Sequence, residues 1–382
     1  MHIVLETVSP LFLGGADQRV AEIRSPSIRG ALRFWFRALT GSVVGDGNIQ
    51  RLRQLEAGVF GDTNRASSLV IRTRPVGRSQ PFFSSLEGIS YLFFSVKMKQ
   101  KRECLPVGLQ FPLTMMARPT PRDAATAFSP DQVMVLGLCS LWLLANLGGL
   151  GARSRRGAGS LRIVRADDEL PDGIPGLTKV PRSVKELGES LSTGLTQLRS
   201  TAFMLGGEGS PVVPGIPSQF SILHPAVCHI HVLGKTWPTW EQALDEVGQA
   251  YRAFRTRRQP DYGEVKGLLL DRRRSIGTVE RAAFGLPLQF SYRSMRGTRA
   301  RVEGKDHDRR ASPLLFKVHR LATGEYAMVL VFFRAVLLAE GEQLKVRTDR
   351  REHSCSPPDF TLVETFLEEL TNVGPLLEVG YQ

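Results

Sequence analysis

The order of extended and helical patterns in the first 165 residues limits this chain to few folds. Strand, helix, strands, helix and strand follow one another, as in the ferredoxin-like (RRM-like) fold. That fold is α+β, with four antiparallel strands and helices on one face. Ser25 is the expected N-cap of the first helix, with Pro26 after it and Gly41 just beyond its end. The patterns predict strands at 2–7, 68–74, 91–99, 107–118 and 160–165, and a second helix that begins at Pro130 or Asp131.

The second half of the chain repeats this scheme. Residues 166–217 between the halves are rich in glycine, proline, serine and charge, which is typical of a linker or a peripheral insertion. We therefore expect two ferredoxin-like domains with antiparallel sheets, at 1–165 and 218–382. The patterns of the second domain are extended structure at 219–233, a helix over about 240–258 capped by Thr239, strands at 315–321 and 326–337, and a helix over about 358–372.

The charge of the chain predicts a polyanionic partner. Lysine and arginine number 50 against 37 aspartates and glutamates, which gives a formal net charge of +13, and most of the basic residues are arginines. Arginine forks match pairs of phosphate oxygens, so this composition favours a nucleic acid. A GC-rich coding bias explains the preference for arginine over lysine, but it leaves the excess of positive charge unexplained.

A glycine-rich loop is the strongest local feature. Residues 148–160 read GGLGARSRRGAGS and combine five glycines with three arginines. The glycines predict a backbone that turns its N–H groups outward as an anion nest, and the arginines add the charge that suits phosphates. The alternative is a helix end followed by a mobile loop. The residues expected to contact a sugar-phosphate backbone are Gly148, Gly149, Gly151, Arg153, Ser154, Arg155, Arg156, Gly157 and Gly159.

A stripe of like charges on the first helix is the second candidate for anion binding. Arg29, Arg33 and Arg37 recur every four residues. No acidic residue lies between Glu22 and Asp46, so we expect the stripe to lack a neutralising partner and to attract an external anion. A solvated helix face is the alternative.

A third basic stretch runs from Arg293 to Arg310. It is long, polar and interrupted by three acidic residues, which predicts a flexible surface loop near RNA. The run Arg272–Arg274 fits solvated surface and contact equally well.

Catalytic and metal-binding patterns are weak. His224, Cys228, His229 and His231 resemble a metal cluster only when counted, because neighbouring residues of one strand point to opposite faces. The four cysteines form no C-x-x-C pair, and Asp17 is a lone loop carboxylate of the kind that usually forms turns. We expect no catalytic residue, no metal and no cofactor.

An uncharged segment at 133–150 has the length of a membrane span. Its glycines, Ser140 and Asn146, and the lack of basic anchors before it, favour a buried core helix. The N-terminus lacks a signal-peptide pattern, so a soluble, cytoplasmic protein without membrane contact is expected.

Several segments together resemble one family. Residues 9–18 and 24–39 look like the opening of the first RAMP subunit of type III-B CRISPR Cmr effector complexes, with Phe36 where the family usually has a second tryptophan. Residues 148–160 resemble the glycine-rich loop of the RAMP superfamily, and 283–288 and 310–317 resemble its C-terminal signatures.

The resemblance implies two fused RRM-like domains near the 3′ end of the crRNA, where the subunit caps a filament of backbone RAMP subunits. It implies crRNA, target RNA and neighbouring RAMP subunits as partners, and it assigns target-RNA cutting to another subunit. The expected RNA contacts then also include Gln18, Arg24, Arg310 and Lys317.

Two alternatives stay open. A metal-independent crRNA-processing endoribonuclease of the same superfamily would need a histidine or similar base within reach of a ribose 2′-OH. None of the seven histidines lies in the glycine-rich loop or on the arginine helix. A protein-only scaffold would carry its basic charge incidentally and would show no RNA affinity at physiological salt.

Overall fold

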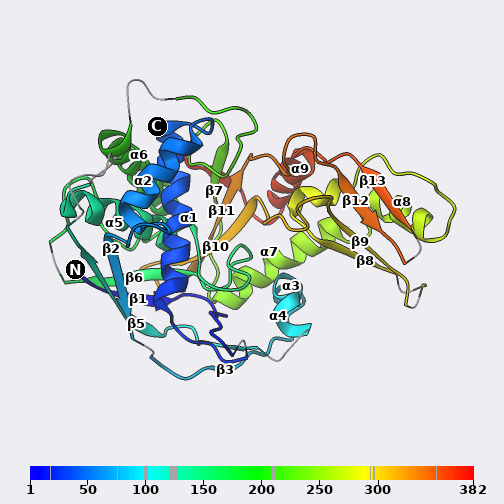
Figure 1. The fold of residues 1–382 in the computed structure, drawn as a ribbon. Coiled ribbons are helices and arrows are strands. Elements are labelled where there is room, and N and C mark those ends of the chain that lie inside the picture. The colour runs from blue at the N-terminus through cyan, green and yellow to red at the C-terminus, as the bar shows by residue number, and fades with distance from the viewer. Residues whose placement is uncertain are drawn as a thin grey trace.

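Two four-stranded sheets form the body of the molecule, and a third sheet extends to one side of it (Figure 1). The computed structural model describes residues 1–17, 19–74, 76–98, 102–119, 128–167, 169–207, 212–292, 294–295, 297–349 and 351–382.

The first sheet has the strand order β2-β5-β1-β6, and all its strand pairs are antiparallel. Helices α1 and α5 pack against one face, so the predicted ferredoxin-like arrangement is confirmed. Residues of β5 alternate between buried and partly exposed, as in a sheet with one face toward solvent. The elements are β1 (His2–Thr7), α1 (Ser25–Val44), β2 (Leu69–Thr73), β5 (Gln110–Ala117), α5 (Pro130–Leu147) and β6 (Leu161–Ala166).

The first helix is longer than the sequence predicted. Arg24 takes the N-cap position, Ser25 is the first helical residue, and Gly45, with a φ of 81°, ends the helix. Gly41 lies inside it, where an added Cβ would be 2.7 Å from Ile222 and 2.8 Å from Phe220. Gly41 therefore permits close packing between helix and loop instead of ending the helix.

The second sheet repeats the topology of the first. Its order is β10-β11-β7-β14, again antiparallel throughout, and α7 and α9 pack on one face. Thr239 caps α7 as predicted, because its side chain accepts from the Gln242 N–H. The elements are β7 (Cys228–Leu233), α7 (Trp240–Arg255), β10 (Leu314–Arg320), β11 (Tyr326–Phe333), α9 (Thr361–Leu370) and β14 (Leu376–Glu378).

Both faces of the second sheet are buried. On β11 every residue after Tyr326 is buried. Val329 and Val331 join the core that contains α5 and α6 (Val184–Gly206), whereas Leu330 and Phe332 join the core of α7 and α9. The second sheet thus lies between its own helices and helices contributed by the first half of the chain.

Helix α6 shows that 166–217, predicted as a linker or a peripheral insertion, contributes to the core. Four leucines of α6, at 187, 191, 195 and 198, are buried in the shared core. The segment also packs tightly on α5, since a Cβ on Gly194 would overlap the Trp142 ring. The exact domain boundaries stay a prediction, but this segment is part of the folded body.

Residues 91–98 form the end of one helix, a turn at Phe93 and a second short helix, so the strand predicted at 91–99 is wrong for them; residue 99 lies outside the described residues. Ile89, Leu92, Phe93 and Val96 are buried at helical spacing, and this period outweighs the aromatic and β-branched composition that suggested a strand. The chain between β2 and β5 contains β3 (Gln80–Pro81), α3 (Glu87–Leu92), α4 (Phe94–Met98) and β4 (Glu103–Cys104).

Helix α3 docks on α7 of the second domain. The two helices cross where Gly88 meets Gly248, and Asp245 of α7 accepts the Gly88 N–H at 2.7 Å. A carboxylate at the first turn of α3 also suits the helix dipole. This contact is one of the links between the two halves of the chain.

The third sheet was not predicted. It is built from two insertions in the second domain, one before β10 and one after β11, and has the order β13-β12-β9-β8. It replaces the flexible loop expected from Arg293 to Arg310, of which Arg293 and Arg296 lie outside the described residues. Its elements and neighbours are α8 (Asp261–Leu269), η1 (Glu280–Phe284), β8 (Leu288–Ser291), β9 (Arg299–Gly304), β12 (Leu344–Arg347) and β13 (Glu352–Cys355).

Helix α5 is a core helix, as predicted. In the described part of the chain it alone is long and apolar enough to cross a membrane, and 72% of its 18 residues are buried within the fold.

The α3–α7 crossing gives a stability prediction. Gly248→Ala should lower the free energy of unfolding by about 1–3 kcal/mol, because the new methyl would lie 2.6 Å from the Gly88 backbone. Gly30→Ala on α1, with no atom within 4 Å of the new Cβ, is the matched control and should add about 0.5–1 kcal/mol. Urea unfolding followed by circular dichroism measures both. Equal effects would contradict the docking of α3 on α7.

Candidate nucleic-acid interface

The glycine-rich loop, residues 148–160 between α5 and β6, is folded against the protein. The N–H of Ala152 donates to the Phe12 carbonyl at 2.8 Å, and the N–H of Gly159 donates to the Pro10 carbonyl at 2.9 Å. Gly151, with a φ of 79°, lies so close to Phe12 that a side chain would overlap its carbonyl. The predicted anion nest of outward N–H groups is therefore wrong for most of the loop. Other loop N–H groups with intramolecular acceptors belong to Leu150, Arg156, Gly157, Ala158 and Ser160.

Arg156 is buried at the junction of the two ferredoxin-like domains. Its guanidinium donates to the Leu314 carbonyl and the Tyr251 hydroxyl, each at 2.9 Å, and to the Phe284 carbonyl at 3.3 Å. It also lies over the rings of Tyr251 and Phe316, at 4.9 and 5.5 Å. Only 8% of the residue is exposed, so the predicted phosphate contact of Arg156 is wrong. Its guanidinium instead holds the loop against the second domain.

Lys317 is also buried rather than available to RNA. The residue has 0% exposure on β10, and its Nζ donates to the Leu161 carbonyl on β6 at 2.7 Å. Burial lowers the pKa of this amine well below its usual value. The predicted phosphate contact of Lys317 is wrong, and its side chain links the two sheets.

Three guanidinium groups remain partly exposed around the loop, and we call Arg153, Arg155 and Arg310 the loop cations. Arg155 donates to the Ser312 carbonyl and lies over the Phe34 ring at 5.1 Å. None of the loop cations forms an ion pair with a carboxylate in the described part of the chain.

The loop cations are in an unfavourable electrostatic setting. Burial lowers the pKa of Arg153 and of Arg155 to about 10, and the next cause is a like-charged neighbour, Arg156 for the first and Arg310 for the second. Burial also lowers the pKa of Arg310. These groups still carry charge at neutral pH. Half-desolvated cations without carboxylates are stabilised by an external anion, so they form the best candidate for an RNA contact.

Two arginines of the α1 stripe share one carboxylate. Glu56 of α2 (Ile49–Phe60) accepts from Arg33 at 2.6 Å and from Arg37 at 2.7 Å. The expectation that the stripe lacks a neutralising partner is therefore wrong for these two residues. Arg29 has no hydrogen bond or ion pair with a described residue, and its enclosed Nε has no acceptor.

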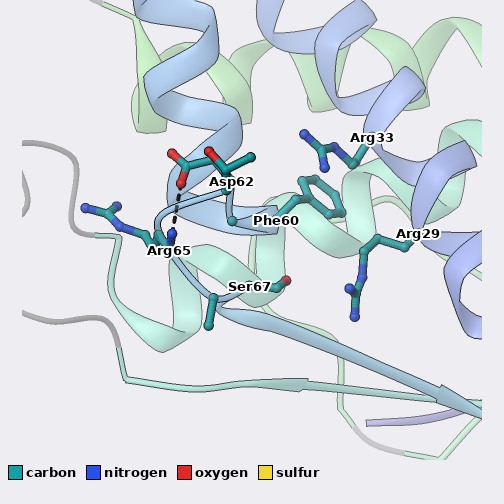
Figure 2. A pocket seen from close by; sticks show the side chains of 9 residues that line it. Arg29, Arg33, Phe60, Asp62, Arg65 and Ser67 are labelled. Carbon is teal, nitrogen blue, oxygen red and sulfur yellow. Dashed lines mark hydrogen bonds between the residues drawn. The ribbon is translucent and has the colours of Figure 1, made fainter.

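A cavity of about 570 Å³ opens between α1 and the turn after α2 (Figure 2). Arg29 and Arg33 line its α1 side, and Arg65 and Ser67 belong to the opposite turn. Asp62 of that turn accepts the backbone N–H of Arg65 at 2.9 Å, so its carboxylate holds the turn together. The volume lies in the usual range of ligand pockets, and the two α1 arginines favour an anionic group.

The other predicted contacts lie outside these clusters. Arg24 pairs with the exposed Glu22 at 3.3 Å, so its charge is compensated. Ser154 lies half-buried in the glycine-rich loop, and its carbonyl accepts the Gly157 N–H. Gln18 lies outside the described residues.

Neither ferredoxin-like sheet offers a surface on which bases can stack. In RRM-like folds that surface is the sheet face opposite the helices. On the second sheet this face is covered by α5 and α6. On the first sheet it carries mainly aliphatic and polar side chains, such as Val4 and Thr114. Its one aromatic ring among the described residues is that of His2 at the start of β1, which lies 3.1 Å from the Thr114 hydroxyl, whereas Phe111 points into the core.

The histidine beside the glycine-rich loop is a poor general base. His319 Nε2 lies 2.7 Å from the Asn146 carbonyl, and burial lowers the pKa of His319 to about 3, with Lys317 as the next cause. Asp17 is paired with Arg19 at 3.2 Å. Among the described residues, no group of three or more His, Cys, Asp or Glu side chains could hold a metal ion.

The burial of Arg156 gives a second stability prediction. Arg156→Lys should lower the free energy of unfolding by about 2–4 kcal/mol, because an ammonium cannot reach all three acceptors of the guanidinium. Arg153→Lys, on the same loop without these bonds, is the control and should cost less than about 1 kcal/mol. Chemical unfolding of both variants provides the comparison. A loss for Arg156→Lys as small as that of the control would contradict its role as a link between the domains.

The sequence of this chain is similar to that of known proteins. Residues 4–162 match the family model of the RAMP superfamily. The CRISPR system Cmr subunit Cmr1-1 of Pyrococcus furiosus is 33% identical over 325 residues, which make up 84% of this chain and 82% of that protein. Subunit Cmr1-2 of the same organism is 32% identical over 184 residues, or 42% of this chain and 92% of that protein.

Solved structures agree in fold over nearly the whole chain. The crystal structure of apo Cmr1 from Pyrococcus furiosus has a TM-score of 0.63 at 24% identity, covering 99% of this chain and 98% of that one. A chain in the cryo-EM structure of the type III-B Cmr-beta bound to cognate target RNA has a TM-score of 0.55 at 13% identity, covering 97% and 98%. The identity to Cmr1-1 over most of both sequences carries more weight, and it shows that this chain belongs to the Cmr1 family of the RAMP superfamily.

Proposed function

We propose that this protein is a non-catalytic, RNA-binding subunit of a cytoplasmic type III-B Cmr complex. In this proposal it holds the 3′ region of the crRNA and the target RNA through sugar-phosphate contacts and caps the filament of backbone subunits. Its relatives are named as Cmr subunits, and one similar chain comes from a Cmr-beta assembly bound to target RNA. Neighbouring RAMP subunits are then its protein partners.

The loop cations are the observation that carries this proposal. Arg153, Arg155 and Arg310 are partly withdrawn from water without a carboxylate partner among the described residues. A phosphate backbone supplies the missing negative charge and accepts the fork of donors that each guanidinium presents. The pocket beside Arg29 and Arg33 offers a second place for phosphate or sugar.

The mode of binding follows from what surrounds these cations. Phosphate contacts fix position without reading sequence, and the two ferredoxin-like sheets present no aromatic platform for bases. We therefore expect binding that depends strongly on salt and weakly on RNA sequence.

Removing two loop cations tests the proposal directly. The double variant Arg153→Gln/Arg155→Gln should reduce the slope of log affinity against log salt by about 1.4, because each phosphate contact on a single strand contributes about 0.7. Fluorescence anisotropy with labelled single-stranded crRNA over a salt series measures the slope. The control is Lys179→Gln/Arg182→Gln, which removes the same charge from exposed residues before α6. An unchanged slope in the loop variant would refute the assignment.

Incubation with RNA tests the non-catalytic part of the proposal. Purified protein should release no discrete products from crRNA precursor or target RNA, with or without divalent cations, beyond those of RNA alone. His319→Ala should behave like the parent protein, because burial makes this histidine a weak base. Discrete cuts that disappear after a histidine substitution would instead favour the endoribonuclease alternative.

A further inference from the structure

Much of the positive charge lies away from the glycine-rich loop. Residues 257–310 carry 14 lysines and arginines against 7 aspartates and glutamates, a net charge of +7 out of +13 for the whole chain. This segment supplies α8, β8 and β9, and β12 and β13 complete the third sheet. In Figure 1 the sheet projects from the second domain, away from the first.

The third sheet has one apolar and one charged face. Its apolar face packs on α8, where Val302 and Val346 join Val265 and Leu268 in a separate small core. Because neighbouring residues on a strand point to opposite sides, the residues beside these valines lie on the other face. Register pairs place Arg301 opposite Arg347, and Glu303 opposite Lys345, across β9 and β12.

A buried carboxylate fixes the cations of this outer face. Glu303 is only 3% exposed and contacts Arg301 at 2.5 Å, Lys345 at 3.6 Å and Arg347 at 3.7 Å. The two arginines also contact more exposed carboxylates, namely Asp308 and Glu352. One buried carboxylate therefore orders three positive side chains, and two outer carboxylates match their remaining charge, so the excess positive charge of this face comes from other residues.

Further cations extend this charged face along β9. Arg299 begins the strand, and Lys305 and Arg309 follow its end; all three are exposed and form no ion pair with a described carboxylate. From Arg299 to Lys305 the strand direction covers about 20 Å, at about 3.3 Å per residue. The positive groups thus form a band rather than a single point.

The band leads to the loop cations. Arg309 precedes Arg310, which is held by a backbone bridge to Leu286. Two residues later the Ser312 carbonyl accepts from Arg155 of the glycine-rich loop. Residues 299–312 therefore connect the outer face of the third sheet with the loop cations by a short, bonded stretch of chain.

We infer that the outer face of the third sheet is a second RNA-binding surface, which receives the sugar-phosphate backbone of a single strand that continues from the loop cations. The inference rests on the proposed function, because it extends the path of the same strand. The outward residues of the four strands include no aromatic side chain, so contact is to phosphate and independent of sequence. An acidic protein segment is the competing occupant.

The test compares two RNA lengths and three charge-removing variants. The extension variant is Arg299→Gln/Lys305→Gln/Arg309→Gln, the loop variant is Arg153→Gln/Arg155→Gln, and the matched control is Lys179→Gln/Arg182→Gln/Lys185→Gln. Single-stranded RNAs of about 8 and about 30 nucleotides are used, since a single binding module typically occupies about 4–16 nucleotides. Thermal unfolding midpoints verify that each variant is folded.

The extension variant should lower the salt slope on the long RNA by about 2 and leave binding of the short RNA unchanged. The loop variant should weaken both RNAs, and the control should change neither. The conservative variant Arg299→Lys/Arg309→Lys should keep the parent slope, because both charges are retained.

The contrary outcomes distinguish a failure of this inference from a failure of the proposed function. If the extension variant binds long RNA like the parent protein while the loop variant is weakened, the inference is wrong and the proposed function stands. The inference is also wrong if the control loses as much affinity for long RNA as the extension variant. It is wrong as well if the extension variant binds RNA like the parent protein and loses affinity only for polyglutamate, the probe for an acidic protein segment. If the parent protein binds neither RNA, the proposed function itself is wrong.

Discussion

Arginine side chains that folding withdraws from water without giving them carboxylates are the constraint on which this protein depends. A buried guanidinium keeps its charge, so the structure must satisfy its donors or leave it at the surface for an anion. The donors of Arg156 are satisfied within the protein, by three carbonyls and a hydroxyl, and two aromatic rings lie beside its guanidinium. Arg153 and Arg155, on the same loop, are left half-buried. One short loop thus supplies both the link between the domains and the positive charge that, in our proposal, contacts RNA.

The packing of the two ferredoxin-like domains explains why we place the proposed RNA contact on loops. The second sheet is covered on both faces, because α5 and α6 occupy the side opposite α7 and α9. Burying that sheet joins the halves of the chain through a large apolar core, and α3 on α7 adds a second connection. The covered sheet cannot stack bases, so the proposed RNA binding relies on cations at the edges of the domains and, in our inference, on the charged face of the third sheet.

Sequence patterns predicted much of the local structure, but they missed helix α6 and most of the tertiary partners. The arrangement of two ferredoxin-like domains and the core position of α5 were predicted from periodicity, but the strand predicted at 91–99 is helical over its described residues and β14 was not predicted. Glu56 was missed as the partner of Arg33 because it lies on another helix, 23 residues away in sequence. Lys317 and Arg156 look like phosphate contacts until the second domain covers them. The third sheet was missed because β9 pairs with β12 across the whole β10–β11 hairpin, and no local pattern reports such a pairing.

A structure of the assembled complex with crRNA and target RNA tests the central claim most directly. The account predicts RNA phosphate oxygens within about 3 Å of the Arg153 and Arg155 guanidinium groups, with Arg156 still enclosed between the domains. It would be contradicted if the Arg153 and Arg155 guanidinium groups faced carboxylates of a neighbouring subunit while the RNA passed elsewhere.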